Sequence, residues 1–62
     1  MYNLNLLAQL EQLATIGIKI DRQGDWFAVS TLEDKGVLPS YDSDLRTAVD
    51  NEFKTAHERG WL

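Results

Sequence analysis

Few side chains of this 62-residue chain are suited to catalysis. His57 is the only histidine, so acid–base chemistry near neutral pH, or metal binding by an imidazole, would depend on it. His57 lies in the last turn of a predicted helix, where a positively charged imidazole would interact favourably with the helix dipole. A structural role is therefore sufficient to explain this residue. No serine lies in the glycine pattern of a nucleophile elbow. The sequence contains no cysteine, which excludes a thiol nucleophile, a thiolate zinc site and a disulfide framework. We therefore expect no enzyme activity.

Asp42, Ser43 and Asp44 place two carboxylates close together, and carboxylate oxygens are ligands that hard divalent cations prefer. A calcium-binding loop needs more oxygen ligands at set spacings than this segment supplies. All three residues are also good helix N-caps, because their side-chain oxygens accept hydrogen bonds from free backbone N–H groups. Capping is the favoured interpretation, so the sequence predicts neither a metal site nor a cofactor.

Aromatic side chains are the main candidates for binding a partner. Tryptophan and tyrosine are frequent anchors of protein interfaces, although in so small a domain two tryptophans are most simply explained as core residues. Acidic residues could add contacts to a basic protein surface. The candidate partner-binding residues are Trp26, Phe27, Tyr41, Asp42, Asp44 and Trp61.

Hydrophobic spacing predicts the elements that carry these residues. Asn3 or Asn5 can cap a first helix over about residues 5–15, with Gln9 on its polar face. Gly17 supplies the left-handed conformation that commonly ends a helix. The predicted apolar face of this helix comprises Leu4, Leu6, Leu7, Leu10, Leu13 and Ala14.

Beyond Gly17 the hydrophobic period changes to two, with Ile18 and Ile20 on the same side. This alternation predicts a half-buried strand. A turn over residues 23–25 then leads into a second strand over residues 26–31, so the two strands form a hairpin.

Residues 33–36 are predicted to form another turn. Residues 37–41 form either an edge strand or an irregular connection, because Pro39 lacks a backbone donor. Gly60 is the predicted C′ residue of a second helix, after which residues 61–62 fold back onto the core. The apolar stripe of that helix comprises Leu45, Ala48, Val49, Phe53 and Ala56.

The predicted fold class is α+β, in a single small domain over residues 1–62. An N-terminal helix, a two- or three-stranded antiparallel sheet and a C-terminal helix follow one another, and we expect both helices on one face of the sheet. The other face or the sheet edges would then be bare, and a partner chain could cover them.

Composition narrows the type of partner. Ten acidic and six basic residues give a net charge of −4, and the acidic excess lies mainly in the second half, where it disfavours contact with phosphate backbones. No segment approaches the roughly 18 consecutive apolar residues of a membrane span. The first residues also lack the basic start and apolar run of a secretory signal. We expect a cytoplasmic protein with a protein partner, and neither membrane nor nucleic-acid binding.

The first half of the chain resembles the small N-terminal docking domains of nonribosomal peptide synthetases. That resemblance implies a hairpin that grips a short acidic or amphipathic tail of a preceding subunit. The chain departs from the family after Trp26, where the basic strand and lysine-rich final helix are missing. The residues that carry the resemblance are Leu6, Leu7, Leu10, Gly17, Ile18, Ile20, Gly24 and Asp25.

The second half, over residues 39–45 and on through Ala48 to Gly60 and Trp61, resembles a segment of small phage-encoded sandwich proteins. In those proteins a Pro-x-Tyr-Ser-like turn opens a helix that ends near Gly-Trp. The resemblance implies a small accessory protein of a phage or mobile element.

Three functions remain open from the sequence. The first is a non-catalytic protein-binding module that inhibits or regulates a host protein. The second is a docking domain that binds a peptide tail of a partner subunit. The third is a structural homodimer or larger homo-oligomer in which the sheet pairs with its own copy.

Overall fold

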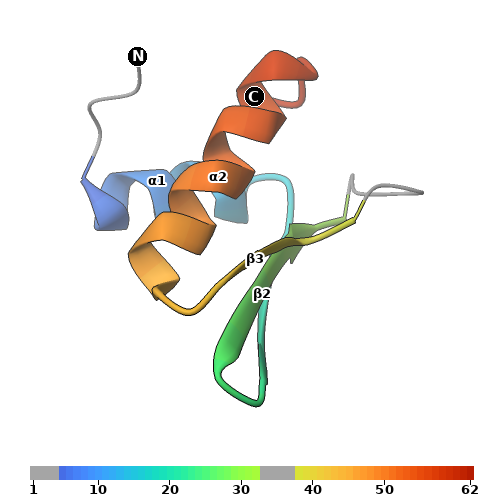
Figure 1. Cartoon of the computed structure of the whole chain (residues 1–62). Coiled ribbons are helices and arrows are strands. Elements are labelled where there is room, and N and C mark those ends of the chain that lie inside the picture. The colour runs from blue at the N-terminus through green and yellow to red at the C-terminus, as the bar shows by residue number, and fades with distance from the viewer. Residues whose placement is uncertain (1–4, 33–37) are drawn as a thin grey trace.

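The computed structural model describes residues 5–32 and 38–62, which form two helices and three strands (Figure 1). The order along the chain is α1 (Leu6–Ala14), β1 (Ile18–Gln23), β2 (Trp26–Thr31), β3 (Ser40–Asp42) and α2 (Leu45–Glu58). This confirms the predicted α+β class with three strands rather than two. The turn predicted at residues 33–36 lies outside the described residues.

The three strands form one antiparallel sheet in the order β1-β2-β3. Gly24 and Asp25 connect β1 to β2, and Gly24 has a positive φ of 63° whereas Asp25 does not. Glycine with positive φ at the first position of a two-residue turn is typical of the type II′ hairpin, whose twist matches that of the strands. β3 has only three residues and follows Pro39, so the third strand begins later than predicted.

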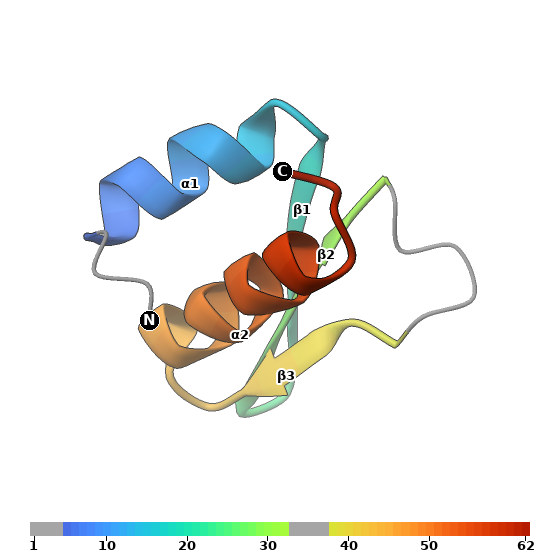
Figure 2. The ribbon, with the colours of Figure 1, turned by 90° about the horizontal axis from the view of Figure 1, so that it is seen from above.

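Both helices lie on the same face of the sheet, as predicted (Figure 2). α2 contacts β2 and β3, while α1 packs on α2 and touches β1. The buried core therefore lies between the helices and one side of the sheet. Its buried members are Leu13, Val29, Ala48, Val49, Phe53 and Ala56. The predicted apolar stripe of α2 is confirmed.

α1 is rotated relative to its predicted orientation. Leu7, expected in the core, is 67% exposed, and Gln9, expected on the polar face, is 3% exposed. The Gln9 side chain donates from Nε2 to Oδ1 of Asp50 on α2, at 2.9 Å. The side of α1 that faces α2 therefore comprises positions 6, 9, 10 and 13, which share one side of a helix.

α2 ends in a Schellman motif. Gly60 has a φ of 76°, its N–H bonds to the carbonyl oxygen of His57 at 3.2 Å, and the Trp61 N–H bonds to that of Ala56 at 2.8 Å. The last two residues consequently turn back, and Trp61 and Leu62 pack against the core, as predicted.

Candidate functional site

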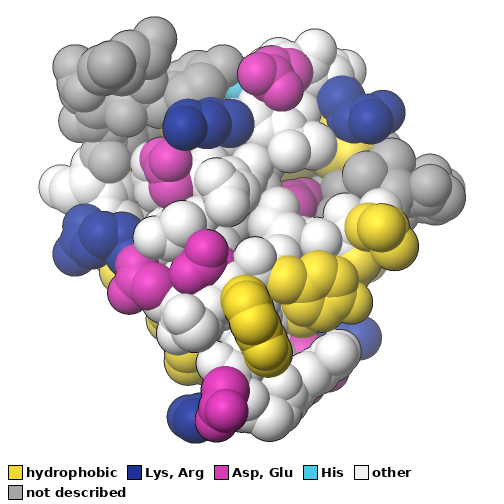
Figure 3. All heavy atoms as spheres, in the orientation of Figure 1, with side chains coloured by type: hydrophobic (Ala, Val, Ile, Leu, Met, Phe, Trp, Pro, Cys, Tyr) yellow, Lys and Arg dark blue, Asp and Glu magenta, His cyan; other side chains and the backbone are white. Residues whose placement is uncertain are grey.

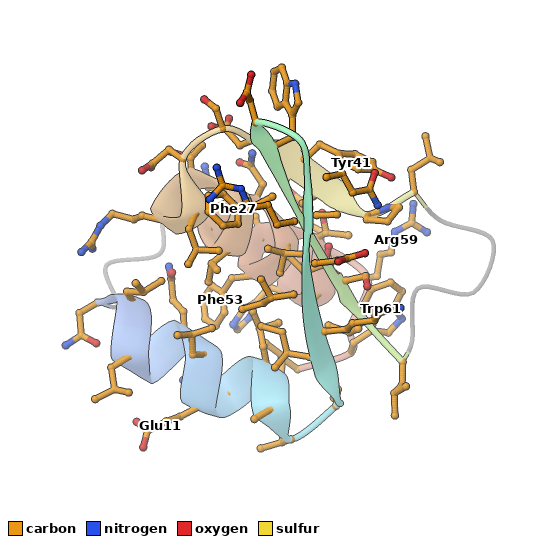
Figure 4. All side chains as sticks on the ribbon, turned by 90° about the horizontal axis from the view of Figure 1, so that it is seen from below. Glu11, Phe27, Tyr41, Phe53, Arg59 and Trp61 are labelled. Atoms are coloured by element: carbon orange, nitrogen blue, oxygen red, sulfur yellow. The ribbon has the colours of Figure 1, made fainter. Side chains whose placement is uncertain are left out.

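The alternation of side chains along the strands divides the sheet into two faces. Val29 lies on the inner face, in the core, whereas its neighbour Ala28 lies on the opposite side and pairs with Tyr41 of β3. Figure 4 shows Phe27 and Tyr41 on opposite sides of the sheet. We call the side away from the helices the outer face; from the register it carries Lys19, Asp21, Gln23, Trp26, Ala28, Ser30 and Tyr41.

Two aromatic side chains dominate the outer face. Trp26 is 53% exposed and Tyr41 is 45% exposed. Because Tyr41 pairs with Ala28, Trp26 is its diagonal neighbour, and such positions lie about 7–8 Å apart, within reach of aromatic side chains. Figure 3 shows hydrophobic side chains side by side over β3 and the adjoining end of the hairpin. We call Trp26, Ala28 and Tyr41 the aromatic platform.

The other two aromatic candidates lie elsewhere. Phe27 is on the inner face, partly buried against the core, and the Arg22 guanidinium lies 5.5 Å from its ring centroid. Trp61 packs against the core from the C-terminal turn, with the Arg59 guanidinium 5.9 Å from its ring centroid. Both rings are thus used within the chain, and neither belongs to the aromatic platform.

Asp42 and Asp44 form the cap of α2. Asp44 is the N-cap residue, and its Oδ2 accepts from the backbone N–H of Thr47 at 3.0 Å and from the Thr47 hydroxyl at 2.8 Å. Asp42 accepts from the N–H of Asp44 at 2.8 Å. Capping is therefore confirmed as the structural role of this segment. Across residues 5–32 and 38–62, no three potential ligand side chains cluster around a metal position.

The hydrogen bond from the Thr47 hydroxyl, followed by that from the Thr47 N–H, lowers the pKa of Asp44 below its ordinary value of 3.8, and Arg46 adds to the effect. A lowered pKa in the folded state means that the carboxylate stabilises the fold above pH 3.8 and loses this effect as the pH falls through the lowered pKa.

We expect Asp44→Ala to lower the urea midpoint of unfolding at pH 7, because α2 loses its N-cap. The difference from the wild type should shrink as the pH is lowered below 3.8. Ser43→Ala is the matched control, since Ser43 is exposed and makes no hydrogen bond to the described residues. A difference for Asp44→Ala that stays constant across this pH range would contradict the assignment.

Glu52 was not singled out from the sequence. It is 1% exposed, and its Oε1 accepts from the Ser40 hydroxyl at 3.0 Å, which ties α2 to β3. The helical spacing of the sequence could have revealed its burial, because position 52 lies three residues after Val49 and four before Ala56 and therefore on the buried stripe.

The remaining polar features are remote from the outer face. A pocket of about 260 Å³ lies against both helices, and its lining residues are Gln9, Arg46, Thr47 and Asp50. Asp50 is already engaged there by Gln9 and by Lys54, whose Nζ lies 3.4 Å from Asp50 Oδ2. His57 packs edge-on against Phe53, with 4.6 Å between the ring centroids. These contacts give Asp50 and His57 structural roles.

No protein-family model matches the chain, and no match is found among curated proteins or solved structures. Neither helix of the described part of the chain has both the length and the apolar character needed to cross a bilayer.

Proposed function

We propose that this protein is a non-catalytic binding module that docks another protein on the outer face of its sheet. The observation that carries the proposal is the aromatic platform: two large aromatic side chains, both about half exposed, lie next to each other on the sheet face that the helices leave uncovered. The proposed role is that of a small phage or mobile-element accessory protein that inhibits or regulates a host protein through this contact.

The platform has the layout of an interface centre. Ala28 is 5% exposed, so the apolar surface that the platform offers to a partner is that of the two aromatic rings. Lys19 and Asp21 lie on the same face and put one charge of each sign beside the apolar centre. Interfaces commonly combine an apolar, aromatic centre with a polar rim. The fitting partner is therefore a protein with an apolar surface ringed by charges of both signs.

Other exposed hydrophobic residues are dispersed. Leu7 is on α1, Ile20 is on the inner face of β1, Leu32 follows β2 and Leu38 precedes β3, so these side chains belong to four different segments. Single exposed leucines are normal on protein surfaces. Leu7 is consequently a matched control for the effect of exposed hydrophobicity alone.

The test is affinity capture from a lysate of the source organism with tagged wild type, Trp26→Ala and Leu7→Ala. We expect a stoichiometric partner with the wild type and Leu7→Ala, and its loss with Trp26→Ala. Circular dichroism should be unchanged in all three, because both substituted side chains are largely exposed. Capture that is independent of Trp26 would contradict docking on the outer face.

A further inference from the structure

β1 is an edge strand that lacks several of the usual protections against pairing, although it carries the charged residues Lys19, Asp21 and Arg22. It is six residues long, contains no proline, and pairs with β2 residue for residue without a bulge. Proline, bulges and short length are common ways of keeping an edge from pairing with another chain. β3, at the opposite edge, has only three residues and follows Pro39. The two edges therefore differ in their capacity to accept a further strand.

The backbone groups on the free side of β1 can be assigned. The Leu32 N–H bonds to the Gly17 carbonyl at 3.0 Å, so the pair that precedes Ile18–Thr31 in the ladder is a hydrogen-bonded one. Hydrogen-bonded and non-hydrogen-bonded pairs alternate along an antiparallel ladder. Ile18, Ile20 and Arg22 thus direct their N–H and C=O groups away from β2. Figure 4 shows β1 in front of the other strands, with no helix lying across it.

We propose that β1 is a self-association site, at which a second copy of this chain adds its own β1 in antiparallel orientation, centred on Ile20. In this register Ile20 of one copy pairs with Ile20 of the other, and Ile18 pairs with Arg22. All of these positions direct their backbone groups to the free edge, so the ladder of one copy matches that of the other. The result is a six-stranded sheet with two-fold symmetry.

Charge selects this register. Centring on Ile20 sets Lys19 of each copy opposite Asp21 of the other, and opposite charges facing each other across strands are stabilising. Moving the centre by one residue sets either Lys19 against Lys19 or Asp21 against Asp21. In the single chain neither residue forms an ion pair with the described residues, so both charges are available.

The apolar side chains favour the same arrangement. Ile20 lies on the inner face, since it pairs with Val29, yet it is 43% exposed. The helices therefore leave much of this side chain uncovered. Pairing at Ile20 brings the two isoleucine side chains together and removes this apolar surface from water. Ile18, which already packs against the core, lies next to this contact.

The pairing has a consequence for the aromatic platform. A two-fold axis perpendicular to the sheet keeps both outer faces on the same side, so the dimer displays two platforms on one surface. A partner with two copies of the docking site would then bind both platforms at once, and its overall affinity would be higher because the second contact forms at a high effective concentration. Self-association itself does not depend on the proposed function, since it uses the free edge of β1 and not the aromatic platform, although Lys19 and Asp21 lie beside both surfaces.

The test is sedimentation equilibrium of the untagged full chain. We expect the wild type to dimerise at high micromolar concentration, and Lys19→Asp and Asp21→Lys each to weaken the dimer about tenfold or more, because each places like charges opposite one another twice. An equimolar mixture of the two variants should dimerise again. In the mixed dimer the two carboxylates on β1 of one copy face the two ammonium groups on β1 of the other, which restores attraction at both positions.

Arg46→Asp, on α2, is the control for the change in net charge and should dimerise like the wild type. Circular dichroism of each variant establishes that it is folded, as expected for exposed positions of an edge strand. A wild type that is monomeric at high micromolar concentration overturns the proposal, as does a mixture that stays monomeric. Trp26→Ala, which leaves the residues of the proposed β1 contact unchanged, should still dimerise, so the loss of partner capture in that variant separates the proposed function from this result.

Discussion

Replacing Phe53 with alanine is expected to remove a large share of the stability of the fold. Phe53 is fully buried and belongs to the core cluster that joins both helices to the sheet. Truncating a buried phenylalanine to alanine costs about 3–5 kcal/mol. At about 0.05–0.15 kcal/mol per residue, 62 residues give a total stability of about 3–9 kcal/mol. The substitution therefore removes between about a third and all of the free energy of unfolding.

Urea titration followed by far-ultraviolet circular dichroism measures this effect. Phe53→Leu is the control, since it keeps an apolar side chain in place and should lose much less. Tyr41→Ala, on the outer face, should unfold close to the wild type. A Phe53→Ala protein with a near-wild-type midpoint would show that the core does not depend on this residue.

Replacing both Trp26 and Tyr41 with alanine is expected to weaken partner binding by about a thousandfold, because anchor residues at interface centres each contribute about 2 kcal/mol or more. The fold should survive, since the two rings are 53% and 45% exposed and lie away from the core. Isothermal titration of the captured partner with the wild type and the double variant gives the change in Kd.

Phe27→Ala is the control variant for that titration. Phe27 is next to Trp26 in the sequence but lies on the inner face, partly buried against the core. Its loss should lower stability while leaving the Kd of the remaining folded fraction nearly unchanged. Equal losses of affinity in Phe27→Ala and the double variant would point to unfolding rather than to a docking surface.

The elements could be predicted from the sequence because their signals are local. Asn5 caps α1 by accepting from the Ala8 N–H at 2.8 Å, Gly24 forms the hairpin turn, and Gly60 ends α2. Each of these depends on residues within one turn of the chain. The α+β class followed from their order.

Features that depend on packing between elements could not be predicted in the same way. Whether Leu7 or Gln9 faces α2 depends on how α1 rotates against its neighbour, and the polar contact from Gln9 to Asp50 spans 41 positions. Both Trp26 and Phe27 are aromatic, so strand alternation alone could not decide which of them faces the helices. The six candidate partner-binding residues therefore belong to three different parts of the structure: the aromatic platform, the core and the cap of α2.

Nuclear magnetic resonance mapping with the captured partner tests the central claim most directly. Titration of unlabelled partner into the 15N-labelled chain should shift or broaden the Trp26 indole signal and the amide signals of β2 and β3. The amides of α1, including those around Leu7, should change little. Changes concentrated on the helices, with the Trp26 indole signal unaffected, would contradict docking on the outer face of the sheet.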